Sequence, residues 1–185
     1  MRQGIVHLGV GAFHRAHQAV YTETVLNGGD TAWGIVGVSL RSPDTRDALA
    51  PQDGLYTVAV RDATGESLQV VGAISSLLVA PESPDAVLDA LTAPDTRIVS
   101  LTVTEKGYCH KPATGELDEA NADIVHDLAA PTTPKSAIGY LVEAIARRRA
   151  AGLAPFTVLS CDNLPSNGET CLLYTSPSPR DRQKS

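Results

Sequence analysis

Residues Ile5–His17 read IVHLGVGAFHRAH, an apolar run that leads into two glycines one residue apart and then into a helical pattern. This order is typical of a strand, a tight turn and a helix N-terminus, where α/β proteins bind the phosphates of a dinucleotide. Gly9 can adopt backbone angles that turn the chain out of the strand, and Gly11, without a Cβ, lets a diphosphate approach the backbone. The free N–H groups of the next helix would then face the anion.

This glycine pair leaves some alternatives open. A bare G-x-G also occurs in surface turns, and His14 takes the place of the third glycine of the usual fingerprint, but the position between strand and helix favours nucleotide binding. Arg15 is either an additional charge for a phosphate or a solvated helix residue. His14 and His17 share a helix face without a third ligand nearby, so we interpret them as packing or cofactor contacts and expect no metal site.

Composition limits the function classes. The 185 residues suffice for one α/β domain, and 43% of them are hydrophobic, as in a globular protein. A net charge of -6 and a pI near 5.3 argue against nucleic acid as the partner. The sequence shows neither a membrane-spanning apolar run nor a secretory signal. Cys109 and Cys161 are expected to be reduced thiols, and the expected location is cytoplasmic.

Strand and helix patterns alternate along the chain. Short apolar runs predict buried parallel strands, helical patterns lie between them, and two alternating segments flank a turn like a hairpin. The predicted strands are residues 4–8, 33–40, 97–104 and 156–161, the predicted helices cover 13–27, a short segment from 83, and 133–149, and the hairpin joins 55–61 to 67–74. We therefore predict an α/β fold: a doubly wound, mostly parallel, Rossmann-like sheet with an antiparallel hairpin as an insertion or edge.

Polar residues follow three of the predicted strands, at Gly9–Arg15, Thr102–Tyr108 and Ser160–Asn163. Ligands bind beyond the carboxyl ends of parallel strands, so these segments should surround one crevice. Glu105 is either an acid/base group or, with Lys106, part of a surface ion pair.

Four further polar residues at these strand ends have either a functional or a purely structural interpretation. Asn163 either donates its amide to a substrate oxygen or caps the next helix, and Asp162 has the same two interpretations. Thr102 and Thr104 either touch the cofactor or fill strand positions.

The end of the second strand bears on the choice of cofactor. In NAD-specific domains an acidic residue there takes the ribose hydroxyls, but here Ser39, Arg41 and Ser42 come before the first acid, Asp44. Ser39, Arg41 and Ser42 could accept a 2′-phosphate, which leaves NADP open beside NAD; alternatively, Arg41 is an ordinary solvated turn residue.

Longer motifs resemble a known family. They are GVGAFHRAH (9–17), DGLYT (53–57), SLTVTEKGY (100–108), PKSAIGY (134–140) and SCDNLPSNG (160–168). Together they closely resemble the N-terminal domain of the mannitol dehydrogenase family, the polyol-specific long-chain dehydrogenases that include mannitol 2-dehydrogenase and fructuronate (mannonate) reductase. The resemblance covers about residues 4–170.

The resemblance implies a cofactor domain followed by a mostly helical substrate domain. It implies metal-free hydride transfer between nicotinamide and a polyol or sugar acid, with oxidation of D-mannitol to D-fructose as the first expectation and fructuronate reduction as the alternative. By the same similarity, Asn163 would belong to the oxyanion-binding pair and Glu105 would lie beside the proton exit path. The expected cofactor-binding residues are Gly9, Val10, Gly11, Ala12, Phe13, His14, Arg15, Ser39, Arg41, Thr102 and Thr104.

One family element is missing from this sequence. The family's general base is a lysine in a K-x-x-x-x-N-x-x-H motif of the second domain, and no lysine here matches it. We expect residues 1–170 to form the dinucleotide-binding domain, residues 171–185 to be a non-native or disordered tail, and the helical domain to be missing. The chain should then bind cofactor weakly and lack turnover. A stand-alone nucleotide-binding module is the alternative from another class.

Overall fold

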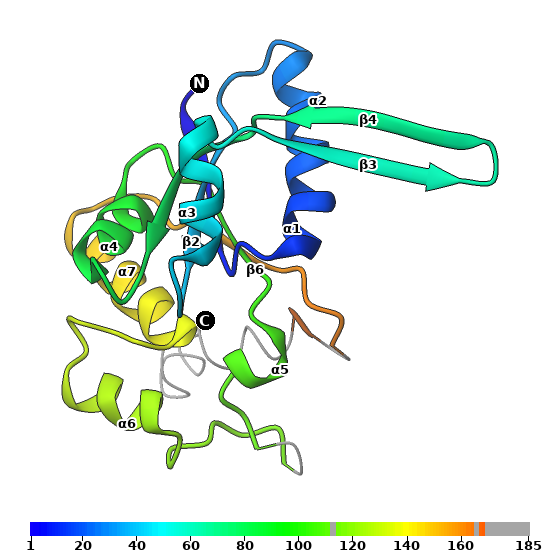
Figure 1. The fold of residues 1–185 in the computed structure, drawn as a ribbon. Coiled ribbons are helices and arrows are strands. Elements are labelled where there is room, and N and C mark those ends of the chain that lie inside the picture. Colours follow the sequence, from blue (N-terminus) through cyan, green and yellow to red (C-terminus); the bar gives the residue numbers. More distant parts are fainter. Residues whose placement is uncertain (112–113, 165–166, 169–185) are drawn as a thin grey trace.

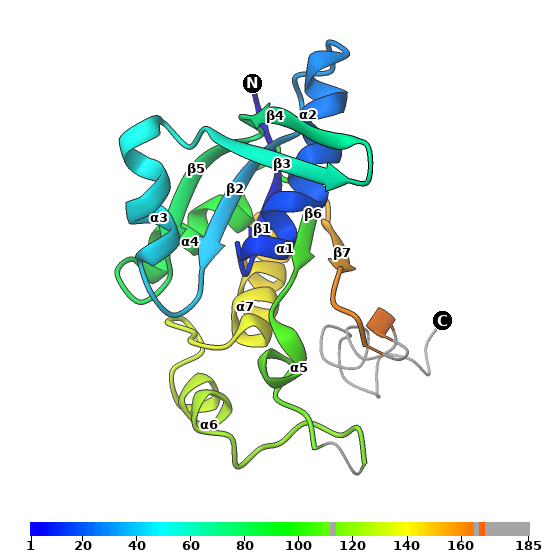
Figure 2. The same ribbon diagram turned by 45° about the vertical axis from the view of Figure 1, so that its right-hand side comes forward.

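The computed structural model describes residues 1–111, 114–164 and 167–168, in which a five-stranded sheet is flanked by helices (Figures 1 and 2). The sheet order is β5-β2-β1-β6-β7, and every neighbouring pair is parallel. Its strands are β1 (Gln3–Leu8), β2 (Gly34–Ser39), β5 (Ile74–Val79), β6 (Ile98–Leu101) and β7 (Thr157–Ser160). The helices are α1 (Ala12–Ala16), α2 (Gln18–Asn27), α3 (Asp44–Leu49), α4 (Pro84–Thr92), α5 (Thr104–Gly107), α6 (Ala122–Ala129) and α7 (Ala137–Ala150), with a 3₁₀ turn, η1, at Ala50–Gln52.

The strand order reverses beside β1. Val6 pairs with Val36 of β2 on one side and with Val99 of β6 on the other. From β1 the chain proceeds outward to β2 and β5, then returns to build β6 and β7 on the opposite side. This is the doubly wound order, and its switch point lies at the carboxyl ends of β1 and β6, where such sheets bind ligands.

Side chains along each strand point alternately to the two faces of the sheet, and helices cover both faces because both are apolar. Val6 and Leu8 of β1 point into a core built with α4 and α7. Ile5 points into a second core, in which Ala19 of α2 and Val71 of the hairpin also pack. The predicted doubly wound sheet is confirmed.

The predicted hairpin is also confirmed, as a sheet of its own. It is formed by β3 (Tyr56–Asp62) and β4 (Gly65–Val71), which pair antiparallel from Tyr56↔Val71 to Asp62↔Gly65. Figure 1 shows it extending away from the domain beside α2. The hairpin exposes Val60, Leu68 and Val70.

Several predicted boundaries are wrong. Ile74 does not end the hairpin but starts β5, a parallel strand. The strand predicted at 97–104 ends at Leu101, because the chain turns into α5 at Thr104. Helix 13–27 is two helices, because the backbone angles at His17 (φ -125, ψ -88) interrupt it. Helices α3 and α6 were not among the predicted helices.

The predicted domain end falls partly outside the described part of the chain, since residues 165–166 and 169–170 are not described. The predicted tail, residues 171–185, lies wholly outside it. Among the described helices, none has the length and apolar character needed to cross a membrane.

Candidate functional site

The glycine turn follows β1 and packs against Thr102, the residue after β6, at the switch point. Gly9 has φ +96, and a Cβ added to it would lie 2.1 Å from the carbonyl oxygen of Thr102, which follows β6. Thr102 Oγ1 donates a hydrogen bond of 2.6 Å to the Gly9 carbonyl. Only glycine fits here, both for its backbone angle and for this close approach.

Gly11, unlike Gly9, is not required by its backbone angle or by a close neighbour. Its φ of -84 is open to any residue, and a Cβ there would meet only the Gly9 oxygen, at 3.9 Å. No side chain caps α1, whose first N–H groups have no partner within the helix. The absence of a Cβ therefore leaves open space in front of uncapped amides, which is what a diphosphate needs.

The third fingerprint position is filled by a buried ring. His14 is fully buried and stacks on His7 of β1, with 3.4 Å between ring centroids and 15° between planes. Burial lowers the pKa of His14 to about 4, an effect that the Gln18 side chain partly opposes. Burial and the charge of His14 also lower the pKa of His7. Two flat neutral rings thus pack helix against strand where the usual fingerprint has glycine.

A cleft of about 780 Å³ opens beyond the carboxyl ends of the strands, within the range for small-molecule sites. Of the predicted cofactor residues, its walls include Gly9, Val10, Gly11, Ser39, Arg41, Thr102 and Thr104.

The other predicted cofactor residues are not among the lining of this cleft: Ala12, Phe13, His14 and Arg15. The His14 ring is buried in the core, and the contact of this residue with the cofactor stays a prediction. Phe13 is 58% exposed and stacks on His17, at 5.1 Å between centroids. The Arg15 guanidinium donates a hydrogen bond to the Val10 carbonyl at 3.2 Å, so its charge is directed at the backbone of the turn.

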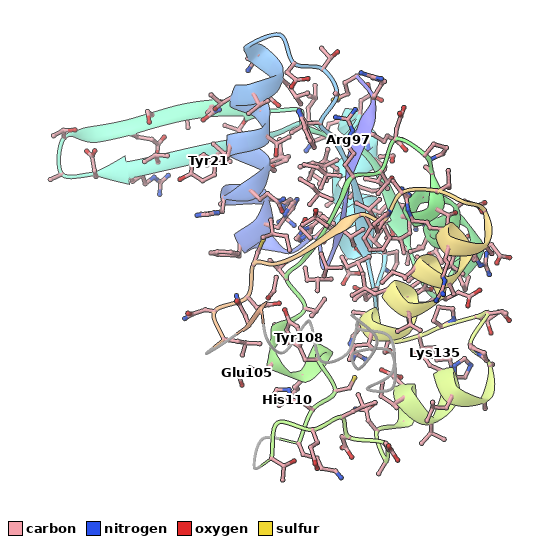
Figure 3. The ribbon with its side chains drawn as sticks, turned by 180° about the vertical axis from the view of Figure 1, so that it is seen from behind. Tyr21, Arg97, Glu105, Tyr108, His110 and Lys135 are labelled. Carbon is pink, nitrogen blue, oxygen red and sulfur yellow. The ribbon has the colours of Figure 1, made fainter. Side chains whose placement is uncertain are left out.

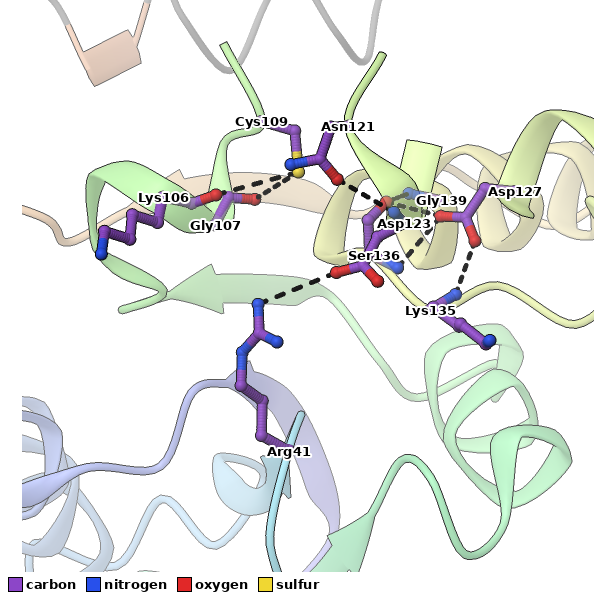
Figure 4. Close-up of polar contacts among 10 residues, drawn as sticks. All are labelled: Arg41, Lys106, Gly107, Cys109, Asn121, Asp123, Asp127, Lys135, Ser136 and Gly139. Carbon is purple, nitrogen blue, oxygen red and sulfur yellow. Dashed lines mark hydrogen bonds and ion pairs between the residues drawn. The ribbon is translucent and has the colours of Figure 1, made fainter. Parts of the chain in front are cut away.

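The far wall of the cleft comes from the segment between β6 and β7, beginning with α6, which was not predicted to lie there. Asp123 of α6 forms an ion pair with Arg41, 3.7 Å between Oδ2 and the guanidinium (Figure 4). The same wall includes His126, Thr133, Pro134, Lys135, Ser136, Ala137 and Tyr140.

A buried carboxylate holds this wall together. Asp127 of α6 accepts hydrogen bonds from the Lys135 N–H (2.7 Å), the Ser136 N–H (3.0 Å) and the Ser136 hydroxyl (2.6 Å). Ser136 caps α7 in turn by accepting from the Gly139 N–H. These contacts, drawn in Figure 4, fix α6 to the start of α7. Asn121 is the sequence signal that could have indicated the start of α6, because asparagine is a preferred helix cap. Its side chain accepts a hydrogen bond from the Asp123 N–H at 3.0 Å.

The predicted catalytic residues lie together in a second hollow of about 380 Å³, which Glu105, Asn163 and Asp162 help to line. Glu105 and Asn163 are both exposed. Figure 3 shows Glu105 near Tyr108, at the end of the molecule opposite Arg97.

Asp162 holds this hollow in shape. Its carboxylate accepts from the N–H groups of Val103 and Thr104, each at 3.0 Å, and from the Tyr108 hydroxyl at 2.8 Å. Thr104 has φ +62, which is unusual for a β-branched residue and needs such support. Asp162 therefore caps the backbone at the start of α5.

The described cysteines are free thiols, and the described side chains form no metal-ligand cluster. Cys109 and Cys161 are free cysteines, as predicted, and burial is the main cause that raises the pKa of both thiols. Within the part of the chain that the structure describes, no three His, Cys, Asp or Glu side chains gather as a metal site requires.

A parallel sheet with a glycine turn and a cleft at its switch point defines a dinucleotide-binding domain of the Rossmann class. Residues 3–173 match the mannitol dehydrogenase Rossmann domain, so this chain belongs to the mannitol dehydrogenase family.

Named relatives agree with this assignment. The chain is 52% identical over 169 residues to D-mannonate oxidoreductase of Escherichia coli, and 50% identical over 172 residues to mannitol 2-dehydrogenase of Pyrenophora tritici-repentis. These matches cover 89% and 91% of the chain, but 35% and 30% of the relatives. A structure of Pseudomonas fluorescens mannitol 2-dehydrogenase with NAD and D-mannitol superimposes with a TM-score of 0.88 at 48% identity, covering 94% of this chain and 37% of that one. This chain thus spans about a third of the length of these relatives.

Proposed function

We propose that this chain is the cofactor-binding part of an NAD-dependent oxidoreductase that interconverts a polyol or sugar acid and its keto form. The observation that carries the proposal is the turn at the switch point, where Gly9 is sterically required and Gly11 leaves open space before uncapped amides. The cleft beside it has a volume suited to a small-molecule ligand. The relative solved with NAD and D-mannitol shares 48% of its residues over this region, which supports the same cofactor here.

The residues of the chain have distinct proposed roles. The backbone from Gly9 to Gly11 binds the diphosphate, and Thr102 and Thr104 contact the cofactor on the β6 side of the cleft. Bound nicotinamide supplies the site that accepts or donates a hydride. Ser39 and Arg41 lie where the adenosine ribose is expected, at the end of β2.

Asn163 and Glu105 are the proposed catalytic residues. The Asn163 amide would donate a hydrogen bond to the substrate oxygen on which charge develops, and Glu105 would take part in proton exit. Both line the same hollow, and the residues before them are joined by the hydrogen bond from the Thr104 N–H to the Asp162 carboxylate. In the family, by resemblance, the general base is a lysine of a second domain, and this sequence holds no such motif.

The relatives support a polyol or a sugar acid as the proposed substrate. The sequence of this chain is 50% identical to a mannitol 2-dehydrogenase and 52% identical to a D-mannonate oxidoreductase. D-mannitol is the first proposed substrate, and the sugar-acid pair of fructuronate and mannonate is the alternative. The free Cys109 and Cys161 thiols suit the proposed cytoplasmic location.

A titration and a turnover assay test this proposal. NADH fluorescence should change saturably on addition of the 185-residue chain, and ADP-ribose should compete, since it carries the same diphosphate. D-mannitol and NAD should yield no NADH above background, because the base is not in this sequence. Absence of saturable NADH binding would contradict the cofactor assignment. Robust mannitol oxidation would contradict the assignment of the base to a second domain.

A further inference from the structure

The Gly9 carbonyl oxygen has three hydrogen-bonding neighbours beneath the glycine turn. The Gly11 N–H donates to it at 2.7 Å, and the Thr102 hydroxyl donates to it at 2.6 Å. The third neighbour is the Nε2 atom of His7, which lies 3.2 Å from this oxygen and 2.8 Å from Thr102 Oγ1. The His7 side chain is fully buried and is not among the residues that line the cleft, so the carbonyl that it contacts faces the interior.

The hydrogen bonds around His7 identify the ring nitrogen that carries the proton. Burial is the main cause that lowers the pKa of His7, so the ring is neutral and has a single N–H. A carbonyl oxygen only accepts, and the Thr102 hydroxyl already gives its one proton to Gly9, so Nε2 must be the donor. Nδ1 is then the acceptor, and it faces the Ser100 hydroxyl at 2.8 Å.

The direction of the Gly9 carbonyl matters for an anion bound at the turn. Gly9 has φ +96, and because glycine adopts many backbone angles at little cost, its own conformation does not fix the peptide that follows it. A carbonyl oxygen carries partial negative charge, so it would repel a diphosphate if this peptide turned outward. Thr102, after β6, restrains the oxygen from one strand, and His7 restrains it from β1.

The His7 ring is itself held in one orientation. His14 stacks on its face, with 3.4 Å between the ring centroids, and Ser100 contacts its Nδ1 atom. Rotation of the ring would separate both nitrogens from their partners. The Nε2–H donor is therefore in place before a ligand binds, as precise binding sites require.

We propose that His7 is a positioning residue for the cofactor, whose Nε2–H holds the Gly9 carbonyl, directly and through the Thr102 hydroxyl, turned away from the bound diphosphate. This inference rests on the proposed function, and it adds a residue that the cofactor does not touch. His7 acts through the turn alone, because its side chain has no surface in the cleft.

Paired substitutions separate the hydrogen-bond donor from the ring. His7→Phe keeps a flat ring that can stack on His14 but removes both nitrogens. His7→Gln loses the ring, and its side-chain amide can place an N–H donor near the position of Nε2. Ser100→Ala is the matched control, because it removes the contact of Nδ1 and leaves the contacts of Nε2 intact.

The experiment titrates NADH by fluorescence into the 185-residue chain and its variants, and urea unfolding gives the stability of each. His7→Phe should weaken NADH binding about fivefold or more, and ADP-ribose binding by the same factor, because both ligands carry the diphosphate. His7→Gln should recover most of this loss, and Ser100→Ala should bind NADH within about twofold of wild type even where its stability falls. Thr102→Val should also weaken binding, and the loss in the double variant with His7→Phe should be smaller than the two single losses combined.

Nitrogen NMR of the wild-type chain with labelled histidine gives a readout that does not depend on a variant's stability. The resonances of His7, assigned by their absence from His7→Phe, should show a protonated Nε2 and an unprotonated Nδ1. The opposite tautomer would leave the Gly9 carbonyl without this donor and would overturn the inference.

The outcomes distinguish this inference from the proposed function. If the wild-type chain binds neither NADH nor ADP-ribose, the proposed function fails, and the inference fails with it. If NADH binds and His7→Phe binds it as tightly as wild type, His7 does not position the turn, and the proposed function stands. Equal losses in His7→Phe and His7→Gln, or a loss in Ser100→Ala as large as that in His7→Phe, would show that the ring only packs, and would also overturn the inference.

Discussion

Replacing Gly9 by alanine tests the geometry at the switch point most directly. The φ of +96 would place an L-residue in a region that costs about 1–2 kcal/mol. The new Cβ would also lie 2.1 Å from the Thr102 carbonyl, so β1 and β6 must move apart, and such overpacking costs about 1–3 kcal/mol. We therefore expect Gly9→Ala to lower the free energy of unfolding by about 2–5 kcal/mol.

Two other glycines separate the causes. Gly29 has φ +99 with no atom within 4 Å of an added Cβ, so Gly29→Ala measures the backbone strain alone, about 1–2 kcal/mol. Gly11→Ala adds neither strain nor a clash, and its free energy of unfolding should stay within about 1 kcal/mol of wild type. Its Cβ would instead fill the space before the α1 amides and weaken NADH binding about tenfold or more.

Urea unfolding followed by the fluorescence of Trp33, the single tryptophan, gives these free energies. NADH titration of the same samples gives the binding. If Gly9→Ala is no less stable than Gly29→Ala, the close approach of Gly9 to Thr102 is wrong. If Gly11→Ala binds NADH as well as wild type, the diphosphate does not lie against this turn.

Three further perturbations probe the supports of the site. The pKa of His14 falls to about 4 in the folded chain from an unfolded value of 6.5, so the stability it contributes is complete above pH 6.5 and is lost as the pH falls toward 4, by about 3 kcal/mol; urea titrations across this range should show the loss, and His14→Phe, which keeps a flat ring, should reduce it. Asp162→Asn leaves one of the N–H groups of Val103 or Thr104 facing an amide, which should lower the free energy of unfolding by about 1–3 kcal/mol, and an unchanged urea midpoint would contradict the role given to this carboxylate. Asp127→Asn disturbs three hydrogen bonds to the start of α7, so amide hydrogen exchange in α6 and the first turn of α7 should quicken while β1 stays protected; equal loosening of both would show that Asp127 is not a local support.

The diphosphate end of the site could be predicted because its determinants are local. The strand, the turn and the helix start are adjacent in sequence, and a glycine pair between an apolar run and a helical pattern specifies their geometry almost alone. The role of His14 could not be predicted in the same way. Whether a histidine at the third fingerprint position faces the ligand or the core depends on how its ring packs on His7 of β1, and the pattern of apolar and polar residues does not specify that stacking.

Elements defined by long-range contacts escaped prediction. Residues 67–79 contain two strands, and the alternation of β4 continues so smoothly toward Ile74 that the change of partner, from β3 to β2, leaves little local signal. The α6 segment has a cap and an apolar face, but its place beside the cleft is set by the contact of Asp127 with Lys135 and Ser136. Nothing within α6 itself indicates that partner.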